Sequence, residues 1–103
     1  MRPIDFNGLD SAVHGPLRLG VLSLLQIEGA MDFTTLKRRL NATDGALGMH
    51  LQKLEENGYI GCKKAFVSRR PKSTYRITAS GKQALADYLE AMQRLIDAIE
   101  AAG

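Results

Sequence analysis

Apolar residues recur along this chain at two different spacings, and the change between them separates helices from strands. Over residues 16–28 they fall on one face of a helix, and Pro16 suits the first turn of that helix. Leu36 and Leu40 lie one turn apart and predict a short second helix, for which Thr34 is the expected cap. The first third of the chain is therefore expected to be helical.

A third helix, predicted over residues 43–58, has two different faces. Leu47, Leu51 and Leu54 share the apolar face, because they are spaced at four and three residues. Thr43 is the expected N-cap, and Gly58 is the expected stop. The opposite face carries Gly45, Met49, Gln52 and Glu56, with Gly48 and Lys53 on its flanks.

Two glycines in the first turns of this third helix are unusual. Each costs roughly 0.8–1 kcal/mol relative to alanine inside a helix. A surface helix that carries Gly45 and Gly48 has a bare backbone, which favours close approach to another molecule.

The second and third helices are joined by a tight turn at Asn41, a residue that tolerates the left-handed conformation. This spacing is typical of a helix-turn-helix, in which the second helix enters the DNA major groove with its N-terminal residues leading. The glycines lie at that N-terminal end. The alternative is an ordinary helical hairpin in a small core.

After Gly58 the pattern changes to that of strands. Residues 59–67 and 74–78 predict two strands, and residues 68–73 form a polar turn with three cations. Such a hairpin is the wing of a winged helix, and its tip can enter the minor groove or hold phosphates. The alternative is a solvent-exposed hairpin whose charges only prevent aggregation. Residues 31–33 predict a short strand-like link.

The last helix is predicted over residues 79–101, behind Thr78 as its cap. Its apolar residues are spaced four, three, four and three, which favours a seam between two copies of the chain. The seam consists of Leu85, Leu89, Met92, Ile96 and Ile99. The alternative is packing against the chain's own core, although the helix is too long for so small a domain to cover it.

Composition limits the possible partners. The 103 residues suffice for one domain, predicted as 1–103, and no apolar run or signal peptide predicts a membrane partner. Residues 34–76 include ten basic and three acidic residues, which gives this segment a net charge of +7, whereas the rest of the chain has a net charge of −4. This uneven distribution indicates a polyanion partner. Cys62 has no cysteine to pair with, which fits the cytoplasm.

Catalytic and metal chemistry find little support. No Cys, His or Asp cluster has ligand spacing, and there is no nucleophile–base pair, phosphate loop or carboxylate pair. We therefore expect no enzyme activity, no metal and no cofactor. Cys62 lies next to Lys63 and Lys64, which favour a thiolate, but a half-buried strand cysteine is the simpler interpretation.

The order of elements resembles the small winged-helix transcriptional regulators of the MarR and ArsR type. Four stretches carry the resemblance, namely residues 14–19, 32–36, 44–60 and 75–81. It implies an α+β fold, mainly α, with a winged helix-turn-helix, a two-stranded β wing and a long C-terminal dimerisation helix. It also implies homodimers that bind double-stranded DNA and often repress. The clustered cysteines of ArsR-type metal sensors are missing here.

The leading hypothesis is a sequence-specific regulator acting on an inverted-repeat operator. It assigns base reading to Gly45, Gly48, Met49 and Gln52. It assigns contacts with phosphates or the minor groove to Thr34, Thr35, Arg38, Thr43, Lys53, Arg69, Arg70 and Lys72. An unknown small-molecule effector could bind between dimer-related helices. The alternative function is a protein-interaction module that uses the same helix without reading bases.

Overall fold

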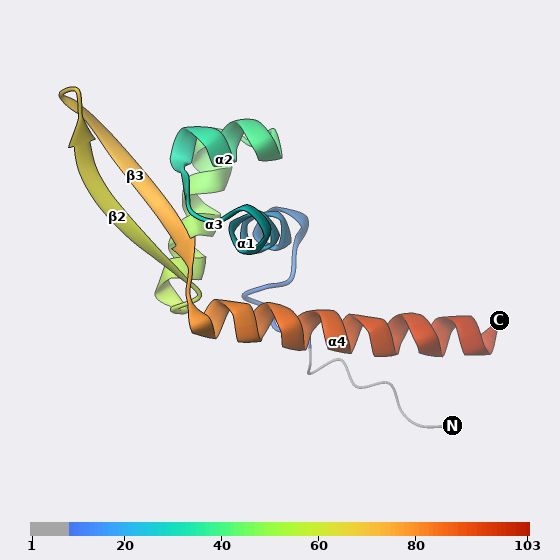
Figure 1. Ribbon diagram of the computed structural model, residues 1–103. Coiled ribbons are helices and arrows are strands. Elements are labelled where there is room, and N and C mark those ends of the chain that lie inside the picture. The colour runs from blue at the N-terminus through green and yellow to red at the C-terminus, as the bar shows by residue number, and fades with distance from the viewer. Residues whose placement is uncertain (1–8) are drawn as a thin grey trace.

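Four helices and a three-stranded antiparallel sheet make up the computed structural model, which describes residues 9–103 (Figure 1). In chain order the elements are α1 (Pro16–Glu28), β1 (Met31–Asp32), α2 (Phe33–Leu40), α3 (Asp44–Glu56), β2 (Ile60–Val67), β3 (Arg70–Ile77) and α4 (Ala79–Ala102). This confirms the predicted fold class, a mainly helical winged helix with a long C-terminal helix.

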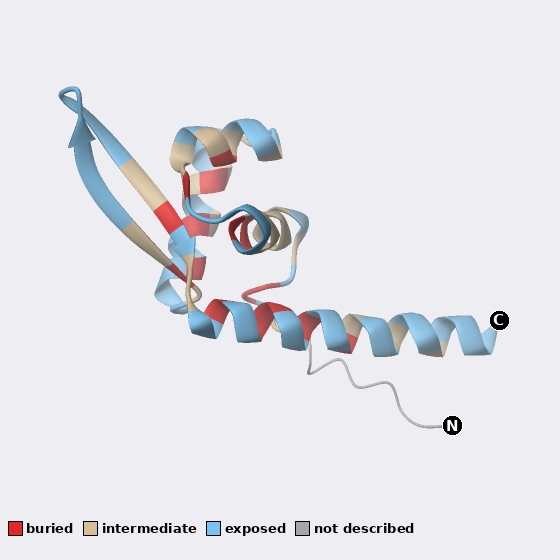
Figure 2. Ribbon diagram, in the orientation of Figure 1, coloured by how far each residue is buried: buried red, intermediate tan, exposed pale blue. Residues whose placement is uncertain are grey.

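The core lies where α1, α3 and the first half of α4 meet the base of the sheet (Figure 2). Leu47, Leu51 and Leu54 of α3 are almost wholly inaccessible to solvent, as are Leu22 and Leu36. Full burial of one such side chain stabilises the fold by about 1.5–3 kcal/mol. The apolar face predicted for the third helix is therefore the face that attaches it to the domain.

The capping predictions are confirmed for two helices and wrong for one. The Thr43 and Thr78 side chains accept hydrogen bonds from the backbone N–H of Ala46 and Gly81, at 3.2 and 3.0 Å. Thr34 does not cap α2. The helix begins at Phe33, and the Asp32 carboxylate accepts from the Thr35 N–H at 2.9 Å. The N-cap therefore lies two residues earlier than predicted, because β1 leads into α2 without a linker.

The wing differs from prediction in the length of its turn. Only Ser68 and Arg69 connect the strands, both with left-handed backbone at φ 51° and 65°, and Val67 pairs with Arg70. Two consecutive left-handed residues match the right-handed twist of a hairpin. The expected six-residue turn is therefore wrong, because residues 70–73 belong to β3.

A third strand extends the predicted two-stranded wing. Met31 and Asp32 pair with Tyr75 and Thr74 of β3, so β3 lies in the centre of the sheet at its base. Because β1 is only two residues long, it covers only that part of the β3 edge.

The start of α4 is fixed to the base of the wing. The Thr78 backbone N–H donates to the Tyr59 carbonyl at 3.0 Å, and the Thr78 hydroxyl donates to the Gly58 carbonyl at 2.6 Å. A Cβ on Gly81 would lie only 2.1 Å from the Tyr59 carbonyl oxygen, so glycine permits this close packing. The end of α3, the start of β2 and the start of α4 are thus held together at one junction.

The second half of α4 leaves the domain (Figures 1 and 2). Leu85, Tyr88 and Ala91 are buried, and the Tyr88 hydroxyl shares a hydrogen bond of 2.6 Å with His14 Nδ1. After Ala91 no residue of the helix is buried. The projection explains why the described chain extends 60 Å along one axis but only 25 and 22 Å along the others.

Candidate nucleic-acid interface

One side of α3 carries exposed side chains. Met49 is 61% exposed, and Gln52 and Lys53 are exposed as well. A Cβ built on Gly45 or Gly48 would meet nothing within 4 Å. Internal packing therefore does not require either glycine, which leaves their bare backbone available to a molecule outside the domain.

Polar contacts hold the ends of this face. Glu56 accepts a hydrogen bond from the Gln52 side-chain amide at 3.2 Å, which engages one of the two amide hydrogens and leaves the carbonyl oxygen of that amide available as an acceptor. At the other end Asp44 forms an ion pair with Lys37 at 2.9 Å. Both pairs are exposed, so each contributes little stability and can rearrange when a ligand arrives.

The cations of α2 are divided between two tasks. Arg39 forms an ion pair with Glu28 of α1, and the hydrogen bond from Arg39 lowers the pKa of the Glu28 carboxyl. Arg38 and Thr34 are exposed, and Thr35 is half-buried with its N–H bonded to Asp32. Of these positions, Thr34 and Arg38 are the more accessible to a phosphate.

Basic residues gather at the tip and the outer part of the wing. Arg69, Arg70 and Lys72 are all exposed. The Lys72 ammonium lies 3.9 Å from the Asp32 carboxylate, whose pKa is lowered mainly by its hydrogen bond to Thr35. Lys72 therefore also links the wing to the start of α2, in addition to the phosphate contact expected of it.

The predicted site residues form two groups. Gly45, Gly48, Met49, Gln52 and Lys53 share the exposed side of α3, whereas Arg69, Arg70 and Lys72 stand on the wing. The Thr43 hydroxyl is already engaged as the α3 cap, so a phosphate would have to share it.

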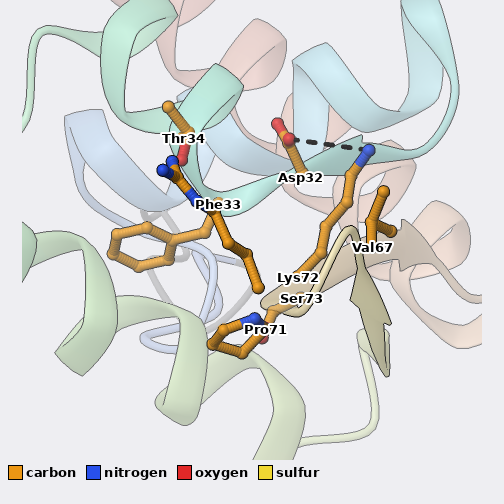
Figure 3. Close-up of a pocket in the computed structure, with 8 residues that line it drawn as sticks. Asp32, Phe33, Thr34, Val67, Pro71, Lys72 and Ser73 are labelled. Carbon is orange, nitrogen blue, oxygen red and sulfur yellow. Dashed lines mark ion pairs between the residues drawn. The ribbon is translucent and has the colours of Figure 1, made fainter.

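A groove that was not predicted from the sequence lies between the wing and the start of α2 (Figure 3). Apolar Phe33, Val67 and Pro71 contribute to its lining. The available signal was the apolar pair Phe66–Val67 at the end of a predicted strand, where the two side chains prove to be 79% and 52% exposed.

Cys62 is half-buried at the base of the wing, opposite Tyr75. Burial is the main reason that the pKa of Tyr75 rises to about 12. The placement of Cys62 agrees with a strand cysteine that contributes to packing.

The five seam residues divide along α4. Leu85 lies in the domain's own core, and Met92 packs partly against it. Leu89, Ile96 and Ile99 are 53%, 40% and 62% exposed, which is high for large aliphatic side chains. Leu85 therefore anchors the helix, Leu89 and Met92 continue the apolar stripe at the edge of the domain, and Ile96 and Ile99 carry it along the projecting part.

Residues 9–103 contain neither a membrane-spanning helix nor a cluster of metal ligands. Among residues 9–103, no helix has both the length and the apolar character needed to cross a membrane. The described side chains likewise include no group of three or more His, Cys, Asp or Glu placed to hold a metal ion.

Comparison with known proteins decides the family. The model of the winged helix DNA-binding domain matches residues 17–96, which is more than half of the chain. The chain belongs to the winged helix DNA-binding domain family. This confirms the predicted DNA-binding fold, and it places the chain among proteins that bind DNA and are not enzymes.

Relatives of this winged helix include proteins of similar length. MJ0432 of Methanocaldococcus jannaschii is 38% identical over 84 residues, which cover 82% of this chain and 91% of that protein. A transcriptional regulator homologue from Pyrococcus horikoshii has a TM-score of 0.80 at 27% identity, over 89% of this chain and 92% of that chain.

A more distant structure shares the fold alone. The PcaV transcriptional regulator from Streptomyces coelicolor, solved with its natural ligand, has a TM-score of 0.70 at 18% identity. The match covers 92% of this winged helix and 66% of the PcaV chain. The family model and the Pyrococcus horikoshii structure confirm the resemblance to winged-helix transcriptional regulators.

Proposed function

We propose that this winged helix is a sequence-specific transcriptional regulator that inserts α3 into the major groove of DNA. The observation that carries the proposal is the exposed side of α3, where Gly45 and Gly48 face open space beside Met49 and Gln52. A helix of this width fits the major groove, and the missing side chains let its backbone lie close to the base edges.

We propose that Met49 and Gln52 contact different bases. Met49 contacts a thymine methyl group, and Gln52 pairs with N6 and N7 of an adenine. Glu56 supports this assignment, because it accepts one hydrogen from the Gln52 amide and leaves the acceptor oxygen and a second hydrogen for the base.

Base reading predicts that two neighbouring variants fail in different ways. Gln52→Ala should cost about 1–3 kcal/mol on the preferred site and relax the preference at one base position. Lys53→Ala, its exposed neighbour, should weaken all sequences evenly. Fluorescence anisotropy with specific and scrambled duplexes measures both effects. Equal losses on both duplexes for both variants would disprove base reading by Gln52.

The wing is proposed to contact phosphates or the minor groove. Each phosphate that a cation neutralises adds roughly −0.9 to the slope of log affinity against log salt concentration. Changing Arg69 and Arg70 together to alanine should therefore make that slope shallower by up to ~2, with the fold intact.

A matched control removes the same charge elsewhere. Lys82 and Arg94 are exposed on α4, and their double alanine variant should keep the wild-type slope. Titrations at several salt concentrations, with circular dichroism to verify folding, compare the two pairs. A wild-type slope in the Arg69/Arg70 variant would remove the wing from the DNA contact surface.

We further propose that the protein acts in the cytoplasm as a homodimer and represses its target. The exposed stripe of α4 forms the dimer contact, and two-fold symmetry then requires an inverted repeat in the operator. The half-sites should be centred about 10 base pairs apart, or a multiple of that distance. Because PcaV was solved with a ligand, we include a small-molecule effector bound between dimer-related helices in the proposal.

A protein-interaction module is the alternative function. The cations of the wing and the +7 charge between residues 34 and 76 favour DNA instead. A gel-shift assay separates the two functions, since a protein-interaction module would not retard any duplex. Selection of bound sequences from a random DNA pool would then give the operator.

A further inference from the structure

The groove between the wing and α2 encloses about 420 Å³ (Figure 3). The wing contributes one wall, and the residues where β1 passes into α2 contribute the other. Its lining residues are Asp32, Phe33, Thr34, Val67, Arg70, Pro71, Lys72 and Ser73.

The groove exists because β1 is short. Met31 and Asp32 pair with Tyr75 and Thr74, and the chain then turns away into α2. Toward the tip, residues 70–73 of β3 pair with β2 on one side only. The groove follows this open edge of β3, between the wing and the start of α2, the first helix of the helix-turn-helix.

The lining combines apolar and cationic groups. Phe33, Val67 and Pro71 supply apolar surface, and Val67 is 52% exposed although it is aliphatic. Arg70 supplies an exposed guanidinium, whereas Lys72 lies 3.9 Å from Asp32 and is partly neutralised there. A groove lined by both apolar and cationic groups suits a ligand in which apolar rings alternate with single negative charges.

We propose that the groove seats the sugar–phosphate backbone of one DNA strand. Arg70 and the Thr34 hydroxyl bind a phosphate, and Val67, Pro71 and Phe33 pack against the adjacent deoxyribose. This inference rests on the proposed function. The packing against deoxyribose is an apolar contact, not an electrostatic one. It adds Phe33, Val67 and Pro71 to the DNA interface.

A peptide strand added to the open edge is the competing occupant, and the edge itself opposes it. Pro71 has no N–H to donate to an added strand, and cations stand on both sides of it at Arg70 and Lys72. Proline and charges on an edge strand are the features that prevent strand pairing. The same cations attract a phosphate backbone.

Val67→Ser tests the apolar contact without changing the charge. Because Val67 is more than half exposed, the fold should tolerate the change. Affinity should fall roughly fivefold on specific and random duplexes alike, while the salt slope stays at its wild-type value. Arg70→Ala should instead make the slope shallower by about 0.9.

Phe66→Ser is the matched control. Phe66 precedes Val67 on the same strand, is 79% exposed and is not one of the residues that line the groove. Its affinity should equal that of the wild type. Wild-type affinity in Val67→Ser, or equal losses in both serine variants, would overturn the groove proposal.

Two further outcomes are distinct. A protein ligand that loses affinity for Val67→Ser, while duplex affinity is unchanged, would assign the groove to a peptide strand and overturn the DNA seat. If the unmodified protein bound no duplex at all, the proposed function itself would fail.

Discussion

Replacing Leu89 and Ile96 together with glutamate should convert a dimer into a monomer and reduce operator affinity by about 100-fold or more. Both side chains are exposed on the stripe of α4, 53% and 40% respectively, so neither supports the core of its own domain. Two like charges on each copy would repel across a symmetric seam. A monomer then binds one half-site alone, and it loses the roughly 100-fold gain in affinity that a linked second copy provides.

The control adds one negative charge to each copy, half of the change in the double variant, and places it off the seam. Gln93 and Glu90 are exposed on α4 between the seam positions, and Gln93→Glu adds a charge there without touching the stripe. It should leave both assembly and affinity unchanged. Analytical ultracentrifugation of the unmodified protein is the direct measurement. A monomer at tens of micromolar would remove the dimer and, with it, the inverted-repeat operator.

Changing Gly45 and Gly48 together to alanine should make the protein more stable and a poorer DNA binder. A Cβ at either position meets nothing within 4 Å, so the substitution introduces no clash. Alanine is favoured over glycine in a helix by about 0.8–1 kcal/mol per position, which predicts a gain of about 1–2 kcal/mol in the free energy of unfolding. On the preferred duplex, the two methyl groups should push α3 away from the bases and weaken binding at least ~10-fold.

Thermal unfolding and anisotropy titration measure the two effects on the same samples. The single variants show which glycine lies nearer to the DNA. Ala46→Gly offers the reverse control, since it should lower stability by a similar amount for one position. A double alanine variant that is more stable and binds DNA as well as the wild type would show that no close approach occurs at these glycines.

The third helix, α3, was predictable because its signals are local. Leu47, Leu51 and Leu54 mark the buried face by spacing alone, and Thr43 marks the start through its own hydrogen bond to Ala46. The exposed glycines followed from the same periodicity. No contact with a distant part of the chain was needed to place these residues.

The features that were predicted wrongly depend on pairing between distant segments. Asp32 replaces Thr34 as the cap because β1 pairs with β3, some forty residues away, and this pairing fixes where α2 begins. The wing turn shrinks to Ser68 and Arg69 because strand pairing continues through polar residues that resemble a loop. The groove beside the wing follows from both pairings, so no single stretch of sequence indicates it.

The C-terminal helix was ambiguous for a different reason. An apolar stripe with the same spacing can face the chain's own core or a second chain, and α4 does the first with Leu85 and Tyr88. Burial of the α4 side chains ends where the folded domain ends, and the extent of the domain along α4 depends on how α1 and α3 pack. Sequence periodicity carries no information about this distance.

The junction at Gly58, Thr78 and Gly81 fixes the start of α4 to the domain, so a rotation at the far end of this helix moves the whole domain. The helix has 24 residues and spans ~36 Å, and its first turn is clamped to the carbonyl of Tyr59 at the base of the wing. In a dimer joined along the far half of α4, the middle of the seam lies ~26 Å from the clamped end, so a swing of about 7° at the seam would carry that end through ~3 Å. That distance is close to the ~3.4 Å rise between successive base pairs, so a small change of angle at the tail would displace α3 by an amount comparable with one base-pair step.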